Sequence, residues 1–165
     1  MPECLFIVIF SMSFNVFAQS ITDTLSSGNK ISIEKNLSIL GGYNFWNNHF
    51  AETGVAINHF RIVGHHPADV AYFISNEIKI DNKLILGPKI GIWFGGGIIW
   101  GLNLIYYTDF NQSSLRFRPE IGLGLGQFKF VYGYNIPVTN KNFEGINKNN
   151  ISIVILFNVK KLKVQ

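Results

Sequence analysis

Residues 115–136 read LRFRPEIGLGLGQFKFVYGYNI, and the alternation within this stretch decides the fold class. From residue 115 to 125 the odd positions are apolar, whereas the even positions hold charged residues and glycine. After residues 126–127 the alternation resumes, with aromatic and aliphatic residues at the even positions from 128 to 136. A period of two places each set on its own face of a strand, and a two-residue connection predicts a hairpin.

The two faces of this hairpin differ in an unusual way. One face is a continuous wall of large aliphatic and aromatic side chains, and the other carries mostly glycine and charge. A membrane barrel shows this pattern, because its apolar side chains face lipid and its small or polar ones face the lumen. A two-stranded ribbon alone would leave backbone groups unpaired in lipid, so other strands must close the barrel.

The remainder of the chain supplies six further alternating segments. The expected strands are residues 36–46, 50–62, 70–80, 84–94, 98–107, 115–125, 128–136 and 150–160. Strands of about ten residues match tilted membrane crossings, and an even number of strands is typical of outer-membrane barrels. The sequence therefore predicts an all-β fold: an eight-stranded antiparallel transmembrane β-barrel of meander topology.

The connections between these segments predict which end of the barrel is exposed. Turns and loops are expected at residues 47–49, 64–69, 81–83, 95–97, 108–114, 126–127 and 137–149. If the amino terminus starts in the periplasm, the loops after odd-numbered strands face the exterior, and the longest loop is among them. Pro88 and Pro119 fall inside expected strands and are interpreted as matched β-bulges.

The amino-terminal segment predicts export. An apolar run starts at Leu5, and Phe17-Ala18-Gln19 offers a cleavage site before Ser20. The expected organisation is therefore a signal peptide at residues 1–19, a polar tether at 20–35, the barrel at 36–160 and a basic tail at 161–165.

Composition narrows the class of protein. A chain of 165 residues corresponds to one domain. Its basic residues are scattered apart from the tail, so nucleic acid is excluded as a partner. The formal net charge of +4 is modest. Cys4 is the single cysteine and lies in the expected signal segment, so the mature part has no disulfide and no thiol chemistry.

The chain resembles the small eight-stranded outer-membrane barrels of the OmpA/OmpX type and, more closely, the uncharacterised outer-membrane β-barrel domain proteins. The resemblance covers roughly residues 37–157. It rests on the alternating strands, on Phe17-Ala18-Gln19 and on the run RPEIGLGLG…FVYGYNIPVTNKNFEGINKNNISI at residues 118–153. It implies a bacterial outer-membrane location, contact with outer-membrane lipid including lipopolysaccharide, and assembly by barrel machinery. It carries over no catalytic residue, cofactor or metal ligand.

Four charged residues are expected to form a polar network in the lumen: Glu77, Lys89, Arg118 and Glu120. Each falls at a position that alternation turns inward, and a buried charge needs a partner. An eight-stranded interior is just wide enough for side chains to fill, so an open solute pore is not expected.

The exposed loops are the expected place of any recognition, because loops on a rigid scaffold often carry function. The main candidate lies in the longest loop, joined by residues 109–114; alternatively, its two apolar side chains pack on the barrel rim. The protein is thus interpreted as a monomeric, non-enzymatic structural or surface-interaction protein with an unidentified extracellular protein or glycan as partner. The candidate recognition residues are Asn140, Lys141, Asn142, Phe143, Glu144, Ile146 and Lys148.

Two other classes remain open at this point. An outer-membrane lipid-modifying enzyme of the lipid A deacylase type would need a Ser/His/acid arrangement, for which His49, Glu52 and Ser113 or Ser114 are candidates. A soluble calycin-like binder would need an apolar cavity, whereas the inward positions here carry charge. The histidines near residues 59–66, with Asp69, are interpreted as solvated or structural rather than as metal ligands.

Overall fold

The computed structural model describes residues 32–63, 66–81 and 83–162 of the chain. The expected signal peptide at residues 1–19 and residues 20–31 of the expected tether lie outside these ranges. Within them, no helix is long and apolar enough to cross a membrane. The strands are β1 (Ser32–Phe45), β2 (His49–Val63), β3 (His66–Lys79), β4 (Leu86–Gly95), β5 (Ile98–Thr108), β6 (Ser113–Leu125), β7 (Phe128–Tyr134), β8 (Ile136–Pro137) and β9 (Asn149–Leu162).

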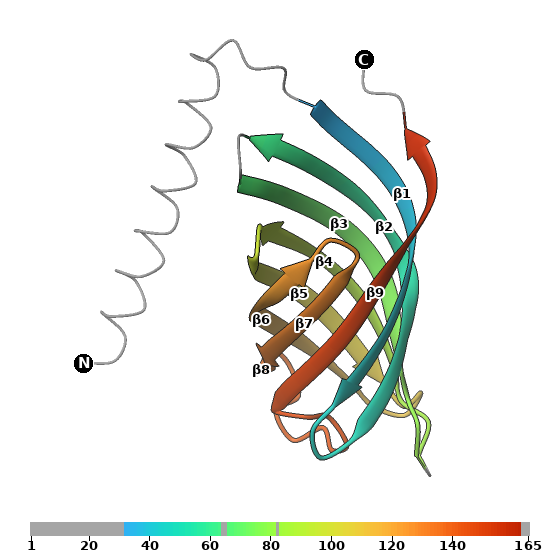
Figure 1. Ribbon diagram of the computed structural model, residues 1–165. Coiled ribbons are helices and arrows are strands. Elements are labelled where there is room, and N and C mark those ends of the chain that lie inside the picture. The colour runs from blue at the N-terminus through green and yellow to red at the C-terminus, as the bar shows by residue number, and fades with distance from the viewer. Residues whose placement is uncertain (1–31, 64–65, 82, 163–165) are drawn as a thin grey trace, which may run out of the picture. The chain divides into compact units, whose positions relative to one another are not determined.

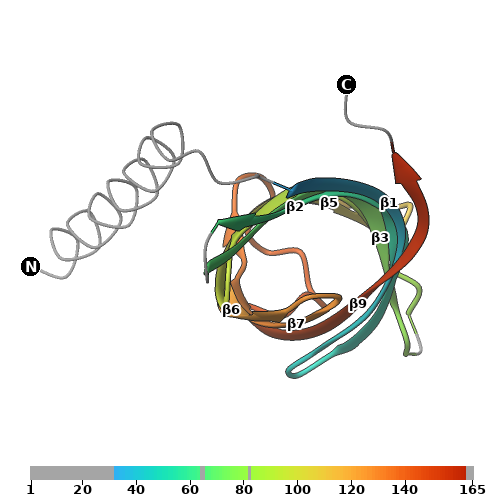
Figure 2. The same ribbon diagram turned by 45° about the horizontal axis from the view of Figure 1, so that its top comes forward.

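The strands close into one barrel (Figures 1 and 2). Each strand from β1 to β6 pairs with the next along the chain, β6 pairs with β7, and β9 joins β7 back to β1. The two-residue β8 continues the line of β7 against β6. The ring therefore has eight positions, and the pairs β1–β9, β2–β3, β3–β4, β4–β5, β5–β6, β6–β7 and β7–β9 are antiparallel. The predicted eight-stranded antiparallel barrel is confirmed.

Three expected strand boundaries differ from those of the structure. β1 begins at Ser32, inside the expected tether, and β9 runs on to Leu162. β3 begins at His66, so strand pairing takes up most of the loop expected at residues 64–69. The β2–β3 register continues without a shift to the pair Val63↔His66. Because β4 pairs with β3 only as far as Asp69, this extension of β3 has a free side, where the sheet tolerates a proline.

The interpretation of Pro88 and Pro119 as bulges is also wrong. The β4–β5 pairs on either side of Pro88, Leu86↔Thr108 and Lys89↔Ile105, keep one register. The β5–β6 register likewise runs unbroken through Pro119. A proline removes a hydrogen-bond donor from the ladder, but it does not require an extra residue. Among the strand pairs described above, a register shift lies instead between β1 and β9, at Leu37/Ser38.

The faces of the barrel follow the predicted alternation. Large apolar side chains cover the outside, from Ile39 on β1 to Phe157 on β9. Polar and charged side chains outnumber apolar ones among the buried residues described. Glycine makes room inside: a Cβ on Gly91 would lie 2.0 Å from the side-chain oxygen of Asn103 and 2.5 Å from the ring of Phe73.

The interior has three zones along the strands. One apolar cluster contains Leu40, Ala56, Ala71, Phe73, Trp93, Val154 and Leu156. A second contains Phe50, Ile85, Ile105, Tyr107 and Phe143. Along β2 and β4 the charged residues Glu52 and Lys89 fall between members of the two clusters, so the charges occupy the middle of the lumen.

Candidate functional site

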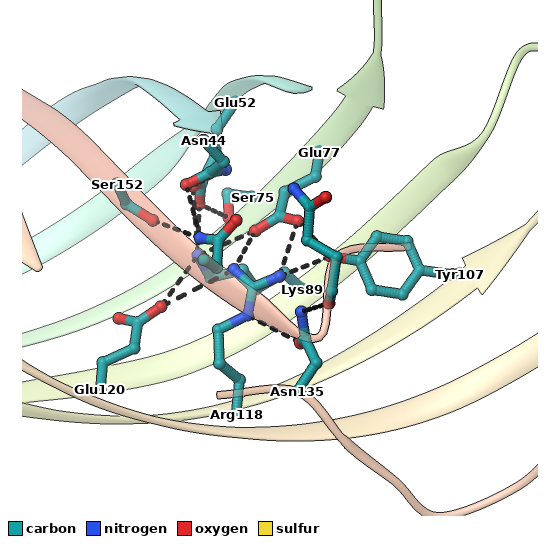
Figure 3. Close-up of polar contacts among 12 residues, drawn as sticks. Asn44, Glu52, Ser75, Glu77, Lys89, Tyr107, Arg118, Glu120, Asn135 and Ser152 are labelled. Carbon is teal, nitrogen blue, oxygen red and sulfur yellow. Dashed lines mark hydrogen bonds and ion pairs between the residues drawn. The ribbon is translucent and has the colours of Figure 1, made fainter. Parts of the chain in front are cut away.

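The middle of the lumen holds an ion-pair network (Figure 3). Arg118 of β6 donates two hydrogen bonds to the carboxylate of Glu77 on β3, at 2.7 and 3.1 Å. Lys89 of β4 lies 3.3 Å from Glu77 and 2.9 Å from Glu52 of β2. The carboxylate of Glu120 lies 3.7 Å from Arg118 and 3.9 Å from Lys89. The structure thus brings together all four residues expected to form a lumen network.

Further polar side chains extend this network. Tyr107 of β5 donates its hydroxyl hydrogen to Glu77 and accepts a hydrogen bond from Arg118. Arg118 Nε also donates to the side-chain oxygen of Asn135, at 2.8 Å. Glu52 accepts from Lys89, from Ser75 Oγ at 2.6 Å and from Asn44 Nδ2 at 3.0 Å. Glu52, Tyr107 and Asn135 all lie at inward positions of the alternation, and that signal would have found them.

The network is closed to solvent. The side chains of Glu52, Glu77, Lys89 and Glu120 have no exposed surface, and that of Arg118 is 1% exposed. Paired and hydrogen-bonded charges are tolerated inside a protein, whereas a charge without a partner is strongly destabilising. The charged groups come from β2, β3, β4 and β6, and Tyr107 of β5 joins them, so the network ties five neighbouring strands together. This arrangement fits a structural role.

One end of the barrel, here called the loop end, is closed by residues 138–148, which connect β8 to β9. Phe143 is 6% exposed and belongs to the cluster of Phe50, Ile85, Ile105 and Tyr107, against which Ile146 also packs. The carbonyl oxygen of Asn147 accepts a hydrogen bond from Asn135 Nδ2, at 2.6 Å. The loop therefore fills the mouth of the lumen.

Asn147 also joins this loop to the connection between β1 and β2. Its side-chain oxygen accepts a hydrogen bond from the backbone N–H of Asn48 at 2.8 Å, and its Nδ2 donates to Asn48 O at 2.7 Å. Gly145 has a φ of +83°, and a Cβ there would lie 2.8 Å from Ile85. The expected recognition residues thus divide between two roles. Phe143 and Ile146 anchor the loop, and the remaining ones are exposed: Asn140, Lys141, Asn142, Glu144 and Lys148.

The neighbouring loop at residues 109–112 is organised by Asp109. One oxygen of its carboxylate accepts hydrogen bonds from the backbone N–H groups of Asn111 and Gln112, and the other lies 2.5 Å from Lys83 Nζ. The hydrogen bond from Lys83, followed by those from the backbone, lowers the pKa of Asp109 to about 2. This turn holds Phe110 at a φ of +69°, with its side chain 73% exposed.

The opposite end, here called the terminus end, carries an ion pair of its own. Lys129 of β7 is buried, and its Nζ lies 2.8 Å from the Asp69 carboxylate on β3. A pocket of about 30 Å³ adjoins this pair, with room for about one water molecule. Its lining residues are Phe60, Asp69, Gly96, Gly124, Gly126 and Lys129.

The candidate Ser, His and acid residues do not contact one another in the structure; each has other hydrogen-bond partners. The ring of His49 is hydrogen-bonded to the hydroxyl of Tyr43 on the outer face, whereas Glu52 lies in the lumen network. Ser114 donates its hydroxyl hydrogen to backbone oxygens of the 138–148 loop. His59 packs edge-on against Tyr72, and His65 lies outside the described residues. Among the residues described, no group of three or more His, Cys, Asp or Glu side chains could hold a metal ion.

Comparison of the chain with family models, with curated proteins and with solved structures found no match.

Proposed function

We propose that this protein is an outer-membrane β-barrel whose wall faces lipid and whose lumen is filled by its own side chains. One observation carries the proposal: the barrel is apolar outside and charged inside. Its outer wall exposes Ile74 at 62%, Ile90 at 57% and Phe130 at 51%, whereas Glu77, Lys89 and Arg118 are buried at its centre. In water this distribution would expose a large apolar surface. In a bilayer the apolar wall would face lipid, and the charged side chains would stay in the lumen, away from lipid.

The closed lumen argues for a structural or surface-interaction role without solute passage. The charge network fills the middle, and the 138–148 loop fills the mouth at the loop end. No catalytic role is proposed, because the candidate nucleophile, base and acid make separate contacts. The protein is proposed to act as a monomer, to contact outer-membrane lipid including lipopolysaccharide, and to be inserted by barrel-assembly machinery.

Recognition of an extracellular protein or glycan is assigned to the exposed rim of the loop end. Lys141, Asn142 and Glu144 are exposed there, while buried Phe143 holds their loop in place. A short loop tip on a rigid support presents polar groups at little cost in conformational entropy. The resemblance to small outer-membrane barrels agrees with this assignment, as does the signal peptide expected at residues 1–19.

Fractionation of cells that express the full chain tests the proposal. The protein should be found in the outer membrane, begin at Ser20 after processing, and migrate faster on a gel before heating than after it. Recovery in the soluble fraction with no heat-dependent shift would contradict it. Replacement of residues 140–148 by an Asn-Gly turn should leave the shift in place and abolish partner binding or the associated phenotype. Unchanged binding in that variant would reject the assignment to this rim.

A further inference from the structure

In the described strands, acidic and basic residues differ in which face of the barrel they occupy. The strand carboxylates all occupy inward positions of the alternation, in phase with buried neighbours; they are Glu34, Glu52, Asp69, Glu77 and Glu120. The outward positions carry charge at Lys35, Arg61 and Lys160, and all three are basic. The outer wall therefore has a single sign of charge among these strand residues.

These three residues, here called the basic collar, lie at the terminus end. They belong to β1, β2 and β9, which are neighbours in the barrel and are seen side by side in Figure 1. Lys35 pairs with Leu162 across β1 and β9, and Arg61 pairs with Ala68 across β2 and β3. The collar thus follows one arc of the rim.

The register shift between β1 and β9 is what turns Lys160 outward. Ser38 pairs with Asn158, and the preceding residue of β1, Leu37, pairs with Lys160, so Val159 is the extra residue of a bulge. Directly paired residues share a face. Lys160 therefore shares the outer face with Leu37; without the bulge it would fall in the inward phase with Asn158.

The collar borders the apolar wall and has free charge. Farther along the outward rows of β1 and β9 the side chains are large and apolar, with Ile39 at 51% and Phe157 at 55% exposed, whereas on β2 the outward neighbour of Arg61 is His59. Lys35 and Arg61 are half-buried, and Lys160 is exposed. None of the three forms an ion pair with a carboxylate of the described residues, and Arg61 Nε is buried without a hydrogen-bond partner.

We propose that the basic collar binds the phosphate groups of anionic phospholipids in the leaflet at the terminus end. The inference rests on the proposed function, because it takes the apolar wall to lie in a bilayer. Headgroup phosphates lie at the edge of the hydrocarbon layer, and long basic side chains reach them while their stems stay on the apolar surface. The collar continues the lipid-facing wall on the convex side of the barrel, where a lipid would lie against it.

Lipid adducts of the full-length barrel, counted by native mass spectrometry, test this proposal. The protein in neutral detergent is titrated with phosphatidylglycerol or phosphatidylcholine. The parent should prefer phosphatidylglycerol, and the double variant Lys35→Gln/Lys160→Gln should lose about fivefold in that preference for each lysine removed. The matched control Lys141→Gln/Lys148→Gln removes the same charge from the loop end and should keep the preference. High salt should weaken the preference of the parent by screening.

Two outcomes overturn the proposal: equal phosphatidylglycerol preference in the parent and the collar variant, or equal loss in the collar variant and its control. Single Lys160→Gln changes one exposed side chain, and it supplies the comparison if the double variant does not fold. Insertion into phosphatidylcholine vesicles, read by heat-dependent gel migration, tests the barrel separately. A parent that inserts but shows no lipid preference refutes the collar alone, whereas a parent that inserts into no vesicle refutes the proposed function.

Discussion

The middle of the lumen and its mouth at the loop end are both filled, but by different means. In the middle, charged side chains from β2, β3, β4 and β6 pair with one another. At the mouth, an apolar cluster is completed by Phe143, which comes from a loop. The middle is therefore part of the sheet itself, whereas the mouth is closed by a segment that can leave without breaking the strands. This difference predicts where substitutions unfold the barrel and where they only open it.

Removal of a central carboxylate should have the largest effect. Glu77→Leu leaves Arg118 buried without its main partner, removes one of the two carboxylates closest to Lys89, and should destabilise the barrel by about 3–5 kcal/mol. Urea unfolding of the full chain in lipid vesicles, followed by heat-dependent gel migration, measures the change. The effect of Glu120→Leu should be smaller, because Glu120 lies 3.7 and 3.9 Å from the two cations.

Glu144→Leu is the matched control on the exposed loop and should change stability by less than about 0.5 kcal/mol. If Glu77→Leu assembles and resists urea as well as the parent, the network does not hold the strands together.

Loss of the loop anchor should open the mouth and spare the barrel. Phe143→Ala removes a buried ring and should weaken loop closure by about 3 kcal/mol. Tryptic cleavage after Lys141 and Lys148 should then accelerate by about two orders of magnitude, since cleavage follows the open population. The heat-dependent gel shift should persist. Val138→Ala, at a residue 54% exposed, is the control. Protection equal to that of the parent would mean that Phe143 is not the anchor.

A backbone substitution in the same loop should have a smaller effect. Gly145→Ala places a Cβ at a φ of +83° and 2.8 Å from Ile85, which should cost about 1–2 kcal/mol of loop closure. Gly97→Ala, in the β4–β5 hairpin, meets no atom within 4 Å and should leave stability nearly unchanged. The same proteolysis assay separates the two variants, and equal protection of both would argue against tight closure at Gly145.

Lowering the pH should destabilise the loop at residues 109–112, and this should be the smallest of the effects on stability. The pKa of Asp109 is lowered to about 2, mainly by its hydrogen bond from Lys83, so the ionised form stabilises the folded loop. This contribution is complete above the ordinary pKa of an aspartate, near 4, and is lost as the pH falls towards 2. The stability difference between the parent and Asp109→Asn should therefore be constant above about pH 4 and shrink below it. A difference that grows on acidification would contradict this.

Alternation in the sequence was sufficient to predict the barrel and the charged residues in the middle of its lumen. Strand phase placed Glu77, Lys89, Arg118 and Glu120 inward, and in the closed sheet they pair with one another and with other inward groups such as Glu52. Glu52 and Tyr107 also occupy inward positions of this alternation, but the expected network was limited to four charged residues and did not include them. A residue inside a narrow barrel is thus predictable wherever the period of two is unbroken.

The mouth and the irregular segments were not predictable in the same way. Phe143 lies in a loop without a period, so its sequence context fits both a packed anchor and an exposed contact. The GHHPAD segment at residues 64–69 has the composition of a turn, yet pairing with β2 extends β3 back to His66. Long-range strand pairing outweighed local turn preference there.

Quenching of single tryptophans by lipid tests the central claim, that the wall faces a bilayer and the lumen does not. Trp100 lies in the outward phase of β5, and Trp93 is 1% exposed inside, donating a hydrogen bond to Glu120 at 2.8 Å. Variants Trp46→Phe/Trp93→Phe and Trp46→Phe/Trp100→Phe each keep one of the chain's three tryptophans. In vesicles of lipids with brominated acyl chains, the fluorescence of Trp100 should be strongly quenched and that of Trp93 nearly unaffected. Strong quenching of Trp93, or none of Trp100 in a folded barrel, would contradict the account.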